Sequence, residues 1–224
     1  IMAKSKQPSP KKKANSADTA PRKTQSSEFL VVGMGASAGG LETLEEFFKA
    51  TPSNPGMAFI IVQHLDPTHK SLMVHLLKSH TDMPVTEVKD NTMVVPNHVY
   101  IIPPNRDMAI FNGVLHLMEP TAARGFRKPI DFFFRSLAED QGEKAVGIIL
   151  SGTGTEGTLS LKNIKGHGGL SIVQDPKTAK YDGMPRSAIA AGVQDFILPV
   201  KDMPELLLKY AKNRKFKPQE IPEK

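Results

Sequence analysis

The sequence contains no cysteine. Without this residue the chain can form neither a disulfide framework nor a thiol nucleophile. It also lacks any apolar run near the ~20 residues that a membrane-spanning helix needs, and its N-terminus lacks the apolar core of a secretory signal peptide. These absences favour a cytoplasmic protein that does not insert into a membrane.

The positive charge of the chain is concentrated at its N-terminus. Residues 1–28 hold seven Lys or Arg against two acidic residues, so they account for +5 of the formal net charge of +6. Because nucleic-acid binding rests on clustered Lys and Arg, the nearly neutral remainder argues against a nucleic-acid partner. Residues 1–28 are also rich in Lys, Ser and Pro, which predicts a disordered basic tail. We expect a charged C-terminal tail over 214–224 and one domain over 29–213.

Between the tails, β-prone runs alternate with helical patterns, which is typical of α/β proteins with a mainly parallel sheet. Helical periodicity places Leu72, Leu76 and Leu77 on the inward face of one helix. Strands are expected at 29–34, 57–63, 145–150, 169–174 and 195–200. Helices are expected at 39–50, 69–80, 129–140, 158–165, 183–192 and 203–213.

The middle of the chain breaks this alternation. Asn112-Gly113 lies between two apolar runs, which is a strong signal for a β-hairpin. We therefore predict a doubly wound, mainly parallel sheet that is flanked by helices and carries a β-hairpin insertion.

Three reactive side chains follow three predicted strands. Ser37 is centred in a G-x-S-x-G pattern after the first strand, His64 follows the second, and Glu156 lies in the loop after 145–150. Ligands of open parallel sheets bind beyond the carboxyl ends of the strands, where these residues would meet. A serine at such a turn needs a base, and a carboxylate would orient the imidazole. The pattern predicts a Ser-His-acid triad.

The small residues around the serine have a predicted role as well. The helix that begins near Gly39 offers free N–H groups and a positive dipole end, where a developing oxyanion would be stabilised. We expect Ala38, Gly39 and Gly154 to form or support the oxyanion site. Each triad residue alone also fits a non-catalytic interpretation: a helix cap for Ser37, a packed or solvated residue for His64, and a helix-terminal charge for Glu156.

Two other classes of site fit less well. Gly33, Gly35 and Gly39 nearly match a dinucleotide-binding fingerprint, but the second strand ends in Gln63-His64 where that fold expects an acidic residue. The histidines at 64, 69, 75 and 80 match no zinc-ligand spacing, so we expect no metal. A Ser-His-acid mechanism also needs no cofactor, so none is expected.

A series of motifs extends this pattern along the chain: GASAGGLE, IVQHLDP, VYIIPP, RKPIDFFFRSLAE, AVGIILSGTGTEG and DGMPRSAI. With them, residues 29–208 resemble the catalytic domain of the chemotaxis protein-glutamate methylesterase (CheB-like) family. The resemblance implies a serine hydrolase that removes methyl esters from glutamate side chains on the helical domains of methyl-accepting chemoreceptors and that can deamidate glutamines there. It assigns the nucleophile to Ser37 and the base to His64.

The chain departs from the family's pattern at three positions. Glu156 stands where the family usually has Asp, Ala38 where Thr is common, and Thr153 where Met is common. These changes predict reduced or altered activity in preference to a complete loss of activity. The alternative is a catalytically impaired module that binds signalling partners. Arg186 and Met184 are candidate substrate-binding residues, although Arg186 also fits a surface charge at a helix start.

The resemblance also bears on regulation and on larger assemblies. Relatives usually carry an N-terminal phospho-receiver domain, and here we expect only the short tail, so control by phosphorylation in cis is not supported. Some relatives are fused to a methyltransferase and sensory modules, which makes such modules candidate partners in a longer protein.

Overall fold

The computed structural model describes residues 28–63, 72–120 and 127–213. The predicted tails lie outside these residues, apart from Glu28. The expected base, His64, also lies outside them.

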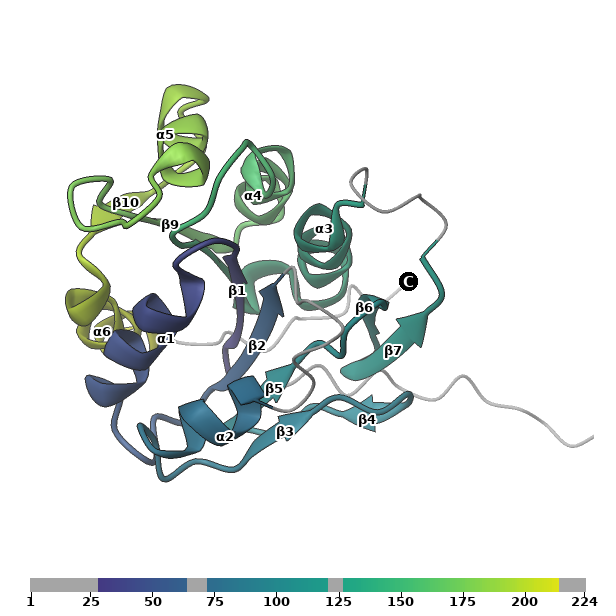
Figure 1. Ribbon diagram of the computed structural model, residues 1–224. Helices are drawn as coiled ribbons and strands as arrows, with labels where there is room; N and C mark the ends of the chain where they lie inside the picture. Colours follow the sequence, from purple (N-terminus) through teal and green to yellow (C-terminus); the bar gives the residue numbers. More distant parts are fainter. Residues whose placement is uncertain (1–27, 64–71, 121–126, 214–224) are drawn as a thin grey trace, which may run out of the picture.

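A seven-stranded parallel sheet forms the centre of the molecule (Figure 1). β1 (Val31–Ala36) lies in its middle, between β2 (Ala58–Gln63) and β8 (Ala145–Ile149). On the β2 side the sheet continues with β5 (His98–Ile101) and β3 (Val85–Glu87), and on the β8 side with β9 (Leu170–Gln174) and β10 (Phe196–Leu198). The chain thus builds the sheet on one side of β1, where β5 returns between β2 and β3, and then on the other side, which confirms the doubly wound prediction. The crevice at the switch point, beyond the carboxyl ends of β1 and β8, is where such sheets bind ligands.

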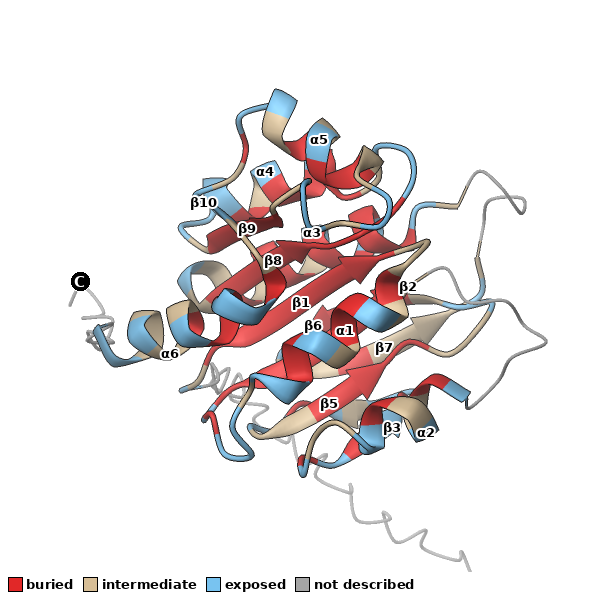
Figure 2. Cartoon of the chain, turned by 60° about the vertical axis from the view of Figure 1, so that its left-hand side comes forward, coloured by how far each residue is buried: buried red, intermediate tan, exposed pale blue. Residues whose placement is uncertain are grey.

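Helices cover both faces of the sheet (Figures 1 and 2). The core on one face includes residues of α1 (Gly40–Lys49), α2 (Leu72–Lys78) and α6 (Met203–Asn213). The core on the other face includes residues of α3 (Pro129–Gln141), α4 (Thr158–Gly166) and α5 (Gly183–Ala190). Because both faces are covered, every residue of β1 is buried, as the red central strands of Figure 2 show. Short 3-10 turns precede β8 and α6, at Gly142–Lys144 (η2) and Val200–Asp202 (η3).

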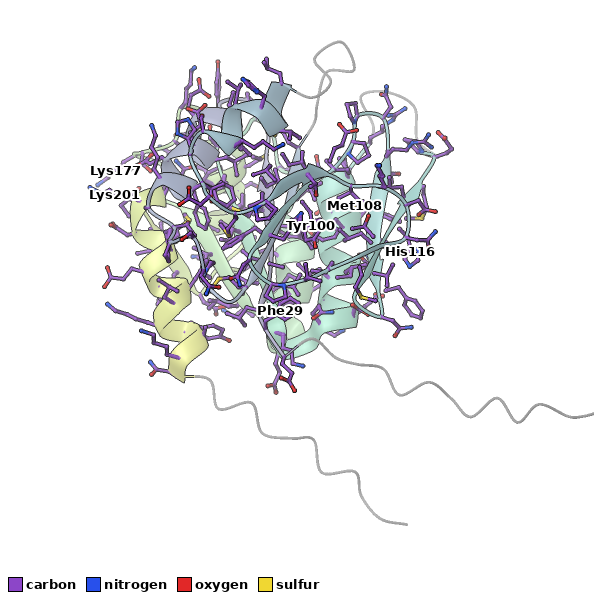
Figure 3. All side chains as sticks on the ribbon, turned by 90° about the horizontal axis from the view of Figure 1, so that it is seen from below. Phe29, Tyr100, Met108, His116, Lys177 and Lys201 are labelled. Atoms are coloured by element: carbon purple, nitrogen blue, oxygen red, sulfur yellow. The ribbon has the colours of Figure 1, made fainter. Side chains whose placement is uncertain are left out.

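The predicted hairpin is present and belongs to a small antiparallel sheet. β6 (Asp107–Phe111) pairs with β7 (Val114–Met118), and β4 (Thr92–Met93) adds a third strand. Asn112 and Gly113 both adopt positive φ, at 51° and 73°, as a two-residue hairpin turn requires. Figure 3 shows Tyr100 and Met108 inside the molecule, in the core that joins this sheet to the large one, whereas Lys177 and Lys201 lie at the surface.

Two glycines of β1 let α3 pack directly on the sheet. A Cβ atom on Gly35 would lie 2.6 Å from Ile130 Cγ2, and one on Gly33 would lie 2.8 Å from Leu137 Cδ2. Both distances are shorter than a carbon–carbon contact allows. Two of the three glycines that nearly matched a dinucleotide fingerprint therefore serve helix–sheet packing.

One detail of the predicted core was wrong. Leu72 is 49% exposed, because α2 turns Met73 and Leu77 toward the sheet, four residues apart on one helix face. The last strand, expected over 195–200, is shorter and forms the sheet edge, where Phe196 and Ile197 are about two-fifths exposed.

Candidate active site

Ser37 lies in the tight turn between β1 and α1, at the carboxyl edge of the parallel sheet (Figure 1). Gly39 precedes the helix with a φ of 71°, in the left-handed region that favours glycine. A Cβ on Gly39 would also lie 2.8 Å from the Ser151 hydroxyl oxygen, so only glycine fits there. The predicted strand–turn–helix context of Ser37 is present.

The backbone of Ser37 is anchored on both sides. Its N–H donates to the carbonyl of Ser151 at 3.0 Å. Its carbonyl accepts from the Gly40 N–H at 3.0 Å and from Nε2 of Gln63 at 3.1 Å. Because the Ser37 N–H is engaged, this group is not available to an oxyanion.

The next two carbonyls of the turn are bonded as well. The Ala38 carbonyl accepts from the Ser151 hydroxyl at 2.9 Å, and the Gly39 carbonyl accepts from the Thr43 hydroxyl at 3.0 Å. Among the described residues, neither the Ala38 nor the Gly39 N–H donates a hydrogen bond. Both groups are therefore candidate oxyanion donors, and the role of Ala38 and Gly39 stays a prediction.

The predicted base directly follows Gln63, the last residue of β2. Gln63 pairs in register with Ala36, the residue before the serine. Gln63, the residue before His64, therefore lies beside the nucleophile turn. The role of His64 stays a prediction.

Glu156 lies in the loop between β8 and α4. Its Oε1 accepts a hydrogen bond from the Ile130 N–H at 2.7 Å, in the first turn of α3. The loop is fixed in return by buried Asp131, whose Oδ1 accepts from the Gly157 N–H at 3.1 Å and from the Ser160 hydroxyl at 2.7 Å. The carboxylate that precedes α4 thus bonds to the N-terminus of α3, and the carboxylate in the first turn of α3 bonds to the N-terminus of α4. Each carboxylate is stabilised by a helix N-terminus.

Glycines in the same loop allow close approach to the serine. A Cβ on Gly152 would lie 3.0 Å from the Ser37 Cβ and 2.2 Å from Met184 Sδ. Gly154 has a φ of 82° and lies at the exposed tip of the loop. Met184, a predicted substrate contact, is only 1% exposed and packs beneath Gly152.

A third loop, which leads into α5, completes the rim. The Gly152 N–H donates to the Tyr181 carbonyl at 2.9 Å. Exposed Arg186 pairs with Asp182 within the loop and helix start. The hydrogen bond from Lys180 to Glu42, at 2.9 Å, links the loop to α1 and lowers the pKa of the Glu42 carboxyl.

Asp107, at the start of β6, is a further carboxylate, and its pKa is affected by the charge of Glu156. Burial raises the pKa of Asp107, the Arg127 charge opposes this rise, and the Glu156 charge adds to it. No sequence pattern singled out Asp107, because its relation to Glu156 depends on the fold.

Sequence reasoning also missed Ser151, Gln63 and Asp131. All three carry polar side chains that are bonded to loops distant in sequence. The one available signal was position: Ser151 and Gln63 end or follow predicted strands, where side chains reach the ligand edge.

Two classes of feature are missing from the described ranges 28–63, 72–120 and 127–213. No three His, Asp or Glu residues there are grouped so that they could bind a metal ion. No helix there combines the length and hydrophobicity that crossing a bilayer requires.

The fold and this turn define a class: doubly wound α/β domains that present a serine in a G-x-S-x-G turn at the carboxyl edge of a parallel sheet. Residues 32–207 match a family model described as CheB methylesterase. The chain belongs to the CheB methylesterase family.

Individual relatives agree. The chain is 37% identical over 188 residues to a protein-glutamate methylesterase/protein-glutamine glutaminase of Shewanella denitrificans, and the match covers 81% of this chain and 52% of the relative. A protein of the same name from Hydrogenovibrio crunogenus is 30% identical, with 80% and 48% covered. The chain thus spans about half the length of these curated relatives. The solved catalytic domain of Thermotoga maritima CheB methylesterase superposes with a TM-score of 0.76 at 30% identity, covering 81% of this chain and 98% of that domain.

Proposed function

We propose that this chain hydrolyses methyl esters of glutamate side chains on chemoreceptor helical domains, with Ser37 as the nucleophile. The observation that carries the proposal is the Ser37 turn, whose carbonyls are all bonded while the Ala38 and Gly39 N–H groups keep no acceptor among the described residues. The names of the relatives supply the substrate class. A cytoplasmic location would follow from this substrate.

In the proposed reaction, His64 takes the hydroxyl proton of Ser37 as Oγ attacks the ester carbonyl. The Ala38 and Gly39 N–H groups stabilise the oxyanion. The tetrahedral intermediate then collapses, the imidazolium gives its proton to the leaving oxygen, and methanol departs. Water activated by the same imidazole hydrolyses the glutamyl ester of Ser37, which releases glutamate and restores the enzyme. With a glutamine side chain the same steps would release ammonia.

The remaining predicted site residues receive supporting roles. Glu156 would orient His64 and stabilise its cation, while α3 holds the Glu156 carboxylate in place. The buried position of Met184 favours support of the Gly152 loop. Arg186 and the exposed tip at Gly154 would meet the receptor helix at the rim.

The test is methanol release from methylated receptor by the full chain and by a Ser37→Ala variant. We expect turnover in the first and none above background in the second. Ser53→Ala, at an exposed serine in the segment between α1 and β2, serves as a matched control and should retain activity. Receptor binding without methanol release would instead support the catalytically impaired interaction module.

A further inference from the structure

Ser151 is a fully buried serine to which the proposed reaction assigns no role. It lies two residues after β8, is 0% exposed, and is found where three loops meet: the nucleophile turn, the acid loop and the loop before α5. We infer that Ser151 is a positioning residue that aims the Gly39 N–H at the oxyanion. This inference rests on the proposed function.

The single hydroxyl proton of Ser151 has a preferred acceptor. The hydroxyl oxygen lies 2.9 Å from the Ala38 carbonyl oxygen and 3.3 Å from that of Tyr181. It also accepts from the Tyr181 N–H at 3.1 Å. Since a hydroxyl carries one proton, the shorter contact assigns that proton to Ala38.

The bond to Ala38 controls the next N–H along the chain. The Ala38 carbonyl and the Gly39 N–H belong to one planar peptide unit, so fixing the carbonyl fixes the direction of the N–H. The flanking glycine tolerates many backbone conformations, so this peptide has little intrinsic resistance to rotation. The Ser151 hydroxyl supplies the resistance.

The backbone of Ser151 is held independently of its hydroxyl. Its N–H donates to Oε1 of buried Gln174 at 2.8 Å, and its carbonyl accepts from the Ser37 N–H at 3.0 Å. A Ser151→Ala substitution therefore removes the hydroxyl's bonds to Ala38 and from the Tyr181 N–H, and it leaves the backbone bonds of Ser151 to Gln174 and Ser37 in place. The contribution of the hydroxyl can be measured by itself.

Ser171 offers a matched control. This serine is also 0% exposed, and its hydroxyl donates at 2.7 Å to Asp195 and lies 2.9 Å from the Val193 carbonyl. It lies near the amino end of β9, and its hydrogen bonds within residues 28–63, 72–120 and 127–213 do not reach the nucleophile turn. Ser171→Ala removes a buried hydroxyl of the same kind without touching the site.

The experiment follows covalent labelling of Ser37 by an alkyl fluorophosphonate, with the adduct located by mass spectrometry. For Ser151→Ala we expect the maximal labelling rate to fall about 10- to 100-fold, as for a displaced oxyanion donor, with half-saturation unchanged. Ser171→Ala should label at the rate of the unmodified protein despite a lower melting temperature. A purely structural role of Ser151 would produce the pattern of Ser171→Ala, and that result would overturn the inference.

Two further outcomes are decisive. If Ser151→Ala does not fold, Ser151→Cys provides a similar side chain with a weaker hydrogen-bond donor. Labelling of folded Ser151→Cys at the rate of the unmodified protein would overturn the inference. If the unmodified protein is not labelled at Ser37, the proposed function fails and this inference falls with it. If the unmodified protein and Ser151→Ala are labelled at equal rates, the inference about Ser151 is overturned while the proposed function stands.

Discussion

The Glu156 carboxylate accepts its hydrogen bond from the Ile130 N–H, 26 residues earlier in the chain. The acid loop is thereby attached to the N-terminus of α3, which packs directly against the glycines of β1. The position of the acid thus depends on the packing of a helix as well as on its own loop. This link separates two roles of Glu156, as a helix cap and as a triad acid.

The cap and the charge can be tested with two variants of Glu156. Gln at this position keeps an oxygen for the Ile130 N–H but loses the charge that would stabilise imidazolium. We expect Glu156→Gln to melt near the unmodified protein and to lose about 10²- to 10⁴-fold in methanol release. Calorimetry checks the melting temperature, and the methanol assay checks the loss of activity.

Glu156→Asp has the opposite pattern. The shorter side chain keeps the charge but withdraws from Ile130, which should cost about 1 kcal/mol, as loss of a helix cap does. For a domain of this size that lowers the melting temperature by about 2–4 °C. Activity above that of Glu156→Gln would show that the charge matters more than the cap. If both variants melt alike, Glu156 does not cap α3.

Gln63 should affect reactivity without affecting stability. Its Nε2 bonds to the Ser37 carbonyl, which shares a peptide plane with the Ala38 N–H, whereas its buried Oε1 has no partner among the described residues. Gln63→Met removes the donor together with an unsatisfied acceptor, so the net change in the free energy of unfolding should be small. We expect fluorophosphonate labelling of Ser37 to slow about 10-fold, since the remaining Gly40 bond still closes the turn. A labelling rate equal to that of the unmodified protein would exclude this role for Gln63.

Sequence patterns predicted the parts of this site that are local in the chain. Alternating strands and helices, the Asn112-Gly113 hairpin and the turn around Ser37 each depend on neighbouring residues, and the structure contains all of them. The bond from Ser151 to Ala38 joins residues 113 positions apart, and the Asp131 bonds span 26 and 29 positions. Such pairs have no signature in a single sequence, because many polar residues could occupy each partner position.

The same limit explains the error in α2. Leu72 and Met73 are adjacent apolar residues, and helical periodicity alone permits either of them to face the core. Tertiary packing selected Met73, which aligns with Leu77 against the sheet.

Asp107 should make stability depend on pH. Its pKa is raised in the folded protein, mainly by burial, so the folded state binds the proton more tightly than the unfolded state. Its contribution to stability is therefore present below the ordinary pKa of Asp and is lost as pH rises through the raised value. The Glu156 charge adds to the rise and Arg127 opposes it.

The measurement compares melting temperatures of the unmodified protein and Asp107→Asn from about pH 3 to pH 7, a range that spans the titration of Asp. Relative to Asp107→Asn, the unmodified protein should lose stability across this range. In a Glu156→Gln background the loss should be smaller, because one source of the raised pKa is gone. A difference between the two proteins that does not vary with pH would contradict the shift.

Gly35→Ala tests the link between sheet packing and the acid. The added Cβ would lie 2.6 Å from Ile130 Cγ2 and 3.3 Å from Ile149 Cδ1, so α3 must move away from β1. Overpacking of this kind costs about 1–3 kcal/mol. Because the Ile130 N–H holds Glu156, the shift should also slow labelling of Ser37 beyond what the loss of folded protein explains.

Gly166→Ala provides the control for this substitution. A Cβ on Gly166, the last residue of α4, would meet no atom within 4 Å, so the change adds the same methyl group without a clash. It should leave labelling unchanged and stability equal or slightly higher, because Ala favours helix over Gly. If Gly35→Ala is destabilised but labels at the full rate per folded molecule, the position of α3 does not control the acid, and Glu156 is oriented by its own loop.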